Sequence, residues 1–262
     1  MAQGSLAPST DLPFSSQDLA YQKVEELLEG SGVPAHYLQT VFSHPNVQID
    51  PEVTYRLLLP AEKKDYSEYR EIFITGPRIW AGARFYKEHE RLVLEISRAF
   101  GVDPLILVSI VGVESSYGRL RGRFSVFNAL YTIIHQVPRR AEWAARELAE
   151  LLKFAYVNRV DPHSISGSYA GAFGYGQFIP SSFNRYAIDY DQDGVRRYDD
   201  WPDVLGSVAN YLVRNGYAAA DLDFSEDAPN WKALYAYNRS RNYVRVILEL
   251  REEIERRLPL AE

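Results

Sequence analysis

The stretch Asp103-Pro-Leu-Ile-Leu-Val-Ser-Ile-Val-Gly-Val-Glu114-Ser-Ser-Tyr-Gly118 decides the fold, because it reads as a helix built almost wholly of core residues. Asp103 is a good N-cap, Pro104 suits the first helical position, and Gly118 is a good C-cap. We therefore predict a helix over 103–117, long enough for roughly four turns. A segment this apolar belongs in the interior of a helical domain.

Glu114 is the one charged side chain inside this helix. It shares a face with Leu107, Ile110 and Val111, which lie seven, four and three residues before it. Apolar surroundings disfavour a carboxylate, so they raise its pKa and keep the acid protonated near neutral pH. A protonated acid at a helix end is what cleavage of a glycosidic bond requires. The alternative is a Glu114 that tips out into solvent at the helix terminus.

Composition places the chain among ordinary globular proteins and excludes several functions. Its 262 residues can form one or two domains, and 46% are hydrophobic while 24% are charged. The net charge of −6 argues against nucleic-acid binding, which usually requires a basic surface. With no Cys, neither a disulfide nor a thiolate metal site can form. No apolar run reaches the length that spans a membrane.

Helical spacing dominates the rest of the chain and predicts a mainly α fold without a convincing pair of alternating strands. The further predicted helices are 16–29, 34–43, 82–100, 139–158, 203–215 and 240–258. Residues 1–16 lack the basic and apolar regions of a signal peptide, and their composition predicts a disordered leader. The long irregular stretch 161–202 is of a kind that usually carries function.

The segment 189–195 predicts a metal site of the EF-hand type. It reads Asp189-Tyr-Asp191-Gln-Asp193-Gly-Val195, with three carboxylates at alternate positions, a glycine at the sharp turn and a backbone carbonyl from Val195. The last ligand is Asp200 at the usual spacing, or Asp203 if the loop is longer. So many oxygen ligands suit Ca²⁺ better than Mg²⁺, and a single loop predicts a structural clamp. The alternative is an acidic surface turn.

The glycine-rich segment 167–182 is not a phosphate-binding loop, because it has neither a lysine nor a preceding strand. Its glycines allow the backbone to approach another backbone or a ligand closely. Ser168 and Gln177 offer a hydroxyl and an amide for hydrogen bonds to such a ligand. A tightly packed turn without a ligand is the alternative interpretation.

Taken together, these segments resemble the membrane-bound lytic transglycosylase B family of peptidoglycan-cleaving enzymes. The matching pieces keep the family's order over roughly residues 60–255, and they are 113–118, 138–142, 167–182, 189–203, 206–211, 237–240 and Tyr243. The resemblance implies a lysozyme-like α domain over 17–262, with a helical lobe at 17–100, a core at 101–258 and a substrate groove. Larger members have an extra β-rich segment where this chain has about twenty residues between Gly216 and Tyr237. Ile179 stands where the family often has Met.

The resemblance also implies roles for individual residues. Glu114 matches the single catalytic acid, and the longer family loop favours Asp203 over Asp200 as the last metal ligand. The residues that match the family's substrate-binding positions are Tyr69, Arg139, Arg140, Ser168, Gln177, Tyr211, Tyr237, Asn238 and Tyr243. Arg139 and Arg140 would face the lactyl or stem-peptide carboxylates, or they are surface charges at a helix start.

The implied activity is cleavage of the bond between N-acetylmuramic acid and N-acetylglucosamine without water, which gives 1,6-anhydromuramic products. The two alternatives are a hydrolytic muramidase of the same fold and a non-catalytic peptidoglycan-binding module. We expect no cofactor for catalysis, a structural Ca²⁺, and glycan strands as the partner, with cell-wall synthesis or remodelling proteins as further candidates. A monomer in the periplasm or cell envelope is expected.

Overall fold

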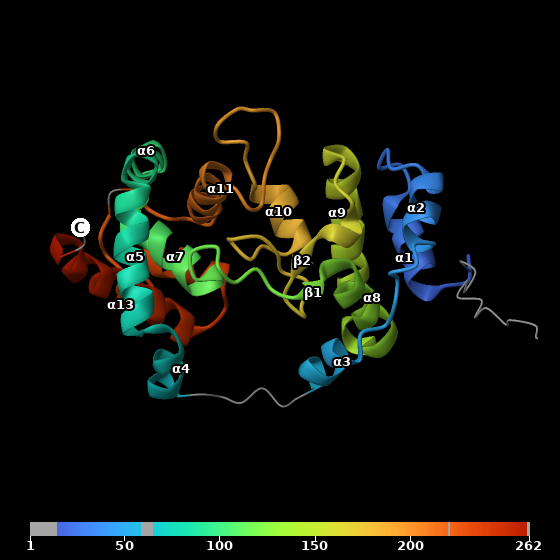
Figure 1. Cartoon of the computed structure of the whole chain (residues 1–262), viewed down its shortest axis with the longest axis horizontal. Coiled ribbons are helices and arrows are strands. Elements are labelled where there is room, and N and C mark those ends of the chain that lie inside the picture. The colour runs from blue at the N-terminus through green and yellow to red at the C-terminus, as the bar shows by residue number, and fades with distance from the viewer. Residues whose placement is uncertain (1–14, 59–64, 220, 261–262) are drawn as a thin grey trace, which may run out of the picture.

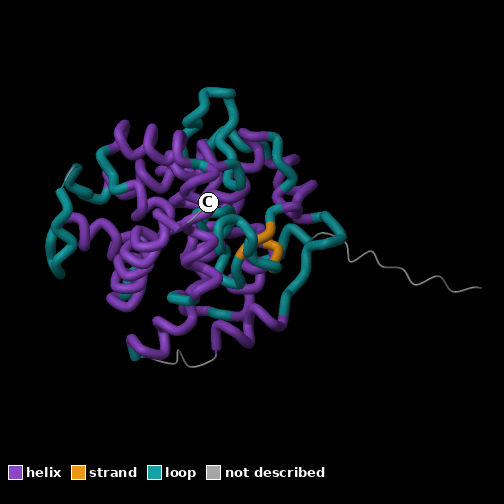
Figure 2. The backbone as a smooth tube through the Cα atoms, turned by 60° about the vertical axis from the view of Figure 1, so that its left-hand side comes forward, coloured by secondary structure: helices purple, strands orange, loops and turns teal. Residues whose placement is uncertain are grey.

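The computed structural model describes residues 15–58, 65–219 and 221–260, and it confirms the mainly α prediction (Figures 1 and 2). Most of the predicted leader, 1–16, lies outside these ranges. The helices are α1 (Leu19–Leu28), α2 (Ala35–Phe42), α3 (Pro51–Leu58), α4 (Tyr66–Phe73), α5 (Gly76–Glu88), α6 (Glu90–Phe100), α7 (Pro104–Ser115), α8 (Val126–Gln136), α9 (Ala141–Asn158), α10 (Pro180–Tyr186), α11 (Trp201–Arg214), α12 (Pro229–Tyr237) and α13 (Arg241–Arg257). Short 3₁₀ turns are η1 (Pro138–Arg140), η2 (Pro162–Ser164) and η3 (Leu258–Leu260).

Two short strands pair with each other in the middle of the chain. β1 (Phe124–Ser125) pairs antiparallel with β2 (Ser166–Gly167), and Phe124 lies opposite Gly167. A Cβ atom on Gly122 would lie 2.0 Å from the Gly167 carbonyl oxygen, so the two backbones touch only because residue 122 is glycine. This contact ties the end of the α7 segment to the start of the glycine-rich loop.

The predicted helix over 82–100 is wrong in one respect, because it is two helices that break at His89. His89 is the C-cap of α5 and the N-cap of α6, with φ −113° and ψ 17°. Phe85 of α5 and Val93 of α6 are both buried, so the apolar spacing continues across the break. A spacing that is kept on both sides gives no sign of the change of direction between them.

Helix α7 lies in the interior and packs against α5, α6, α11 and α13. Every residue of 105–113 is buried, so the helix is enclosed on all sides and not only on the face that bears Glu114. Within the described ranges, no single helix is long and apolar enough to cross a membrane. The pair α6 and α7 meets that test of length and composition only when taken together, and it is bent by 114°.

The remaining helices form two groups at opposite ends of the longest axis. Figure 1 shows α1, α2, α8 and α9 at one end, and α4, α5, α6, α7 and α13 at the other, with the β1–β2 pair and α10 between them. Helix α3 packs on α8, whereas α4 packs on α13. Residues 17–100, predicted as one lobe, therefore contribute helices to both ends of the molecule.

Candidate active site

Glu114 occupies the last turn of α7, directly before an abrupt change in backbone direction. The helix ends at Ser115. The three residues that follow it, Ser116, Tyr117 and Gly118, have φ values of 50°, 60° and 77°. The C-cap is Ser116 and not Gly118 as predicted. Left-handed geometry is costly for non-glycine residues and persists only where the surroundings enforce it. Here the Tyr117 hydroxyl donates a hydrogen bond to the Arg78 carbonyl oxygen at 3.1 Å.

The Glu114 carboxyl group is half-buried and accepts a hydrogen bond from the hydroxyl of Tyr243 at 2.8 Å. Burial raises the pKa of Glu114 from 4.5 to about 7, although the bond from Tyr243 acts in the opposite direction. A carboxyl with this pKa is present in both protonation states near neutral pH, so it can first donate and then accept a proton. The sequence-based prediction of a raised pKa therefore agrees with the geometry.

Three tyrosines from three different helices lie close enough to this acid for its charge to affect them. They are Tyr69 of α4, Tyr237 of α12 and Tyr243 of α13, and burial together with the charge of Glu114 raises the pKa of each. The rings of Tyr237 and Tyr243 are stacked 6.4 Å apart at an angle of 2°. Within the described chain, the groups that interact with Glu114 are these phenols and no second carboxylate. A buried acid among neutral hydroxyls is suited to proton transfer.

The glycine-rich loop reaches the same cluster through its backbone. The Tyr237 hydroxyl donates to the Gly176 carbonyl oxygen at 2.6 Å. Gln177, with φ 49°, turns its side chain back so that Nε2 donates to the Gly174 carbonyl oxygen at 2.9 Å. Tyr211 continues the row, because its ring lies 4.8 Å from that of Tyr237. The structure thus brings Tyr211 to the tyrosines around Glu114, and Gln177 directly follows the glycine whose carbonyl Tyr237 contacts.

The four remaining predicted substrate residues form no hydrogen bond or ring contact with Glu114 or with the tyrosines around it, in the part of the chain that the structure describes. The Ser168 hydroxyl accepts the backbone N–H of residues 170 and 172 at 3.3 and 3.1 Å, which closes the glycine-rich turn. Arg140 lies over the ring of Trp143 at 4.4 Å, and Arg139 is exposed on η1. Asn238 is exposed at the end of α12. Substrate binding by these four remains a prediction.

Carboxylate oxygens of Asp189, Asp191 and Asp203 lie within 4.8 Å of one another, close enough to share a metal ion. Asp203 is fully buried, and burial raises its pKa, with further contributions from the charges of Asp191 and Asp189. It also accepts the backbone N–H groups of Tyr190 and Arg197, each at 2.7 Å, so it fixes both sides of the loop. This oxygen-only donor set fits Ca²⁺.

The other predicted ligands of this loop lie outside that group. Asp193 forms an ion pair with Arg197, and its Oδ1 accepts the backbone N–H of Val195 at 2.9 Å. Val195 is exposed, and Asp200 is the N-cap position of α11 without a side-chain capping bond. Of the two alternatives for the last acid, Asp203 is the one whose carboxylate faces Asp189 and Asp191.

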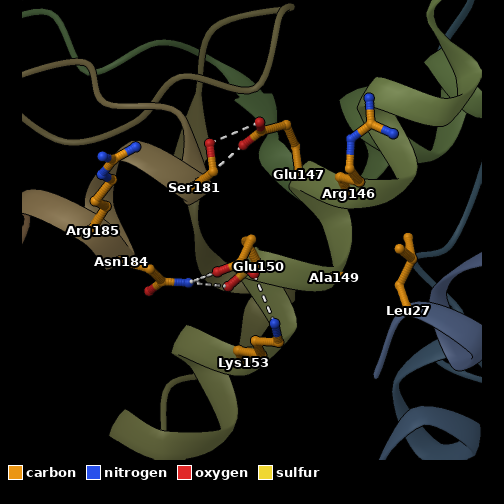
Figure 3. Close-up of a pocket in the computed structure, with 9 residues that line it drawn as sticks. All are labelled: Leu27, Arg146, Glu147, Ala149, Glu150, Lys153, Ser181, Asn184 and Arg185. Atoms are coloured by element: carbon orange, nitrogen blue, oxygen red, sulfur yellow. Dashed lines mark hydrogen bonds and ion pairs between the residues drawn. The ribbon is translucent and has the colours of Figure 1, made fainter. Parts of the chain in front are cut away.

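A surface cavity of about 580 Å³ lies apart from Glu114, between α1, α9 and α10 (Figure 3). Figure 3 shows its carboxylates turned toward partners on the protein. Glu147, 4% exposed, accepts the backbone N–H and the hydroxyl of Ser181 at 2.9 and 2.8 Å. Glu150 pairs with Lys153 and accepts a bond from the amide of Asn184. The buried Glu147 therefore anchors the first turn of α10, which ends the glycine-rich loop.

Comparison with solved structures assigns the fold. The Escherichia coli lytic transglycosylase SLT35, in complex with calcium, matches with a TM-score of 0.82 at 26% identity, over 92% of this chain and 93% of that one. SltB3 from Pseudomonas aeruginosa, in complex with NAG-anhNAM-pentapeptide, matches with a TM-score of 0.80 at 25% identity, over 90% and 78% of the two chains. The fold and the buried acid define a protein of the lysozyme-like helical class.

Sequence comparison then identifies the family. Residues 16–224 match the family model of the transglycosylase SLT domain, and the chain belongs to this family. The membrane-bound lytic murein transglycosylase B of Escherichia coli strain K12 is 40% identical over 216 residues, which are 79% of this chain. The chain spans 60% of the length of that relative. The resemblance recognised in the sequence motifs is thereby confirmed.

Proposed function

We propose that this chain is a lytic murein transglycosylase that cleaves peptidoglycan between N-acetylmuramic acid and N-acetylglucosamine without consuming water. The observation that carries the proposal is Glu114, a half-buried carboxyl whose pKa is raised to about 7 and whose neighbours are tyrosines. Family membership and the names of the relatives support the same activity.

In the first step, the protonated Glu114 donates its proton to the oxygen of the glycosidic bond as the bond to the muramic acid C1 breaks. Positive charge then develops on the sugar ring, and glycosidases commonly stabilise it with a second carboxylate. Since the described groups around Glu114 are phenols, the substrate's own N-acetyl oxygen supplies this stabilisation in our proposal. Tyr69 and Tyr237 line the space and exclude bulk water.

In the second step, the ionised Glu114 takes the proton of the C6 hydroxyl of the same muramic acid, and the C6 oxygen bonds to C1. The ring that closes is the 1,6-anhydro product, so one carboxyl acts first as acid and then as base. The hydroxyl of Tyr243 at 2.8 Å holds the carboxyl in place through both steps. No metal or other cofactor takes part in this sequence of proton transfers.

Mass spectrometry of the products from purified cell walls tests the reaction directly. We expect every new muramic end to be lighter by one water than a hydrolytic end, because the C6 hydroxyl replaces water as the nucleophile. Reducing muramic ends alone would assign the chain to hydrolytic muramidases. Glycan binding without release of soluble fragments would assign it to non-catalytic binding modules.

Substitution of Tyr237 by Phe or of Gln177 by Ala should slow the reaction less than loss of Glu114 does. Each change removes a contact that holds the glycine-rich loop, namely the bond to Gly176 or the bond to Gly174. Misplacement of substrate by about 1 Å costs roughly a hundredfold in rate, which sets the upper end of the expected loss. Melting temperatures measured beside the rates identify the role, because a groove residue gives a stable but slow enzyme. A large drop in melting temperature would assign Tyr237 to core packing instead.

The loop of Asp189, Asp191 and Asp203 is proposed to bind a structural Ca²⁺, with the Val195 carbonyl and Asp193 as further ligands once the ion is bound. The fit rests on the convergence of three carboxylates and on the burial of Asp203.

Glycan strands are the proposed partner, and the name of the Escherichia coli relative supports a periplasmic or envelope location. Arg139 and Arg140 remain candidates for stem-peptide carboxylates, or they are surface charges on η1.

A further inference from the structure

Helix α4 reaches the candidate active site although none of its residues is buried. It is only eight residues long, and a helix of that length is unstable without tertiary support. A capping box between Asp65 and Glu68 stabilises its first turn. Nevertheless Tyr69, in its middle, is half-buried and interacts electrostatically with Glu114. Its apolar contact with the core is limited to the partly buried side chains of Tyr66, Tyr69 and Phe73, so polar contacts must add to the hold on α4.

Glu249 of α13 provides such a hold on one side of α4. Its carboxylate accepts the hydroxyl of Tyr66 at 2.5 Å, and the Nε and Nη2 atoms of Arg70 approach its Oε1 at 2.6 Å each. The Glu249 side chain is 24% exposed, so this pairing is partly shielded from water and strengthened by that shielding. The guanidinium of Arg245 also lies 3.5 Å from the centre of the Tyr66 ring.

Arg78 of α5 holds the opposite end of the same helix. Its Nη1 donates to the carbonyl oxygens of Ile72 and Phe73 at 2.7 and 3.1 Å, which lie in the last turn of α4 where carbonyls lack a partner within the helix. The carbonyl oxygen of Arg78 in turn accepts the hydroxyl of Tyr117, three residues beyond Glu114. The two ends of α4 are thus joined by polar contacts to α13 and to the end of α7.

We propose that Glu249 is a positioning residue that acts through Tyr66 and Arg70, and that it keeps Tyr69 beside Glu114 so that water stays away from this carboxyl. The effect on catalysis rests on the proposed function, whereas the effect on the environment of Glu114 does not. Release of α4 would leave the fully buried core in place, because the helix contributes only partly buried side chains to it. It would hydrate Glu114 and take Tyr69 away from this carboxyl.

Hydration of Glu114 has a defined consequence for its titration. Burial is the largest cause of its raised pKa, so water that enters beside Tyr69 must lower that pKa. The described titratable groups that act on Glu114 are Tyr69 of α4, Tyr237 of α12 and Tyr243 of α13. Helices α5, α6 and α11, which also pack on α7, add no charged partner for Glu114 within the described ranges.

Two variants of opposite charge change separate positioning from simple electrostatics. Glu249→Ala removes a negative charge, so a purely Coulombic effect would lower the pKa of Glu114. The double variant Tyr66→Phe with Arg70→Gln removes a positive charge from the same cluster, so the Coulombic effect would raise that pKa. Positioning predicts that both variants lower it by about one unit, since both release α4. Glu252→Ala is the matched control, because Glu252 on the same helix pairs with Arg256 and not with α4.

The first measurement is the pKa of Glu114, obtained by NMR of protein with ¹³C-labelled Glu carboxyl groups. The Glu114 signal is assigned by its loss in Glu114→Gln. The second measurement is the rate on purified cell walls as a function of pH. We expect kcat/KM to fall by roughly tenfold to a hundredfold in both α4-releasing variants. The alkaline limb of their pH–rate profiles should move to lower pH together with the pKa of Glu114. Glu249→Gln should recover part of the loss in kcat/KM. The melting temperatures of the variants should stay near that of the parent. Shifts of opposite sign in the two variants, or an unchanged pKa in both, would overturn the proposal. A parent chain inactive on cell walls whose Glu114 pKa still falls in both variants would refute the proposed function alone.

Discussion

Glu114→Gln is expected to abolish turnover of peptidoglycan while the fold and the affinity for glycan are retained. Gln fills the same volume and still accepts a hydrogen bond from Tyr243, but it has no proton to donate to the leaving oxygen. General acid–base catalysis contributes at least about a hundredfold, so the loss should be of that size or larger. Turbidity of cell-wall suspensions measures the rate, and near-normal clearing by the variant would remove Glu114 from the mechanism.

The pH dependence of the parent provides the control for this variant. The reaction starts with protonated Glu114, so kcat/KM should fall as pH rises through about 7, the pKa that burial gives this group.

The raised pKa of Glu114 also affects the stability of the folded protein. A folded-state pKa raised from 4.5 to about 7 favours folding below pH 4.5, and this contribution is lost as pH rises through 7. At roughly 1.4 kcal/mol per pKa unit, the loss is at most about 3.5 kcal/mol. Glu114→Gln should therefore melt above the parent at pH 8 and near it at pH 4.

The parts of the fold that the sequence predicted are those with local signals. Asp103 and Pro104 mark the start of α7, and the side chain of Asp103 accepts the N–H groups of residues 105 and 106. Helix α4 was not predicted, although the capping box of Asp65 and Glu68 and the helical spacing of Tyr66, Tyr69 and Phe73 were readable signals. Helix α8 was not predicted either, although Ser125, whose side chain accepts the N–H of Asn128, marks its start.

The candidate site shows a similar division between local and long-range information. Glu114 could be identified from its own helix, because the apolar residues around it are its neighbours in sequence. The tyrosines around it could be placed only through the family resemblance, since Tyr69 and Tyr243 come from distant helices. The bonds from Tyr66 and Arg70 to Glu249 join residues 183 and 179 positions apart, and no spacing in the sequence indicates them. Long-range contacts of this kind are set by packing.

Calcium is expected to raise the melting temperature of the chain after treatment with a chelator. The ion would offset the repulsion among Asp189, Asp191 and Asp203, whose oxygens lie within 4.8 Å of one another. A ligand at a hundred times its Kd stabilises the folded state by about 2.7 kcal/mol. For a chain of this size each kcal/mol corresponds to roughly 2–4 °C, so the expected increase is about 5–10 °C. Differential scanning calorimetry across a calcium titration measures it.

Asp191→Asn is the sharper variant for this test, because Asp191 is exposed and its other bond is a 3.2 Å contact with the N–H of Asp193. It should remove most of the calcium-dependent increase and leave the chelated protein slightly more stable, since one repelling charge is gone. Asp203 is a poorer choice because its carboxylate also holds the N–H groups of Tyr190 and Arg197. In the proposed mechanism Glu114 acts without a metal, so the chelated parent should still release anhydro products below its melting temperature. Equal melting temperatures with and without calcium in the parent would reject the metal site, and the buried Asp203 would then serve only to join the loop to α11.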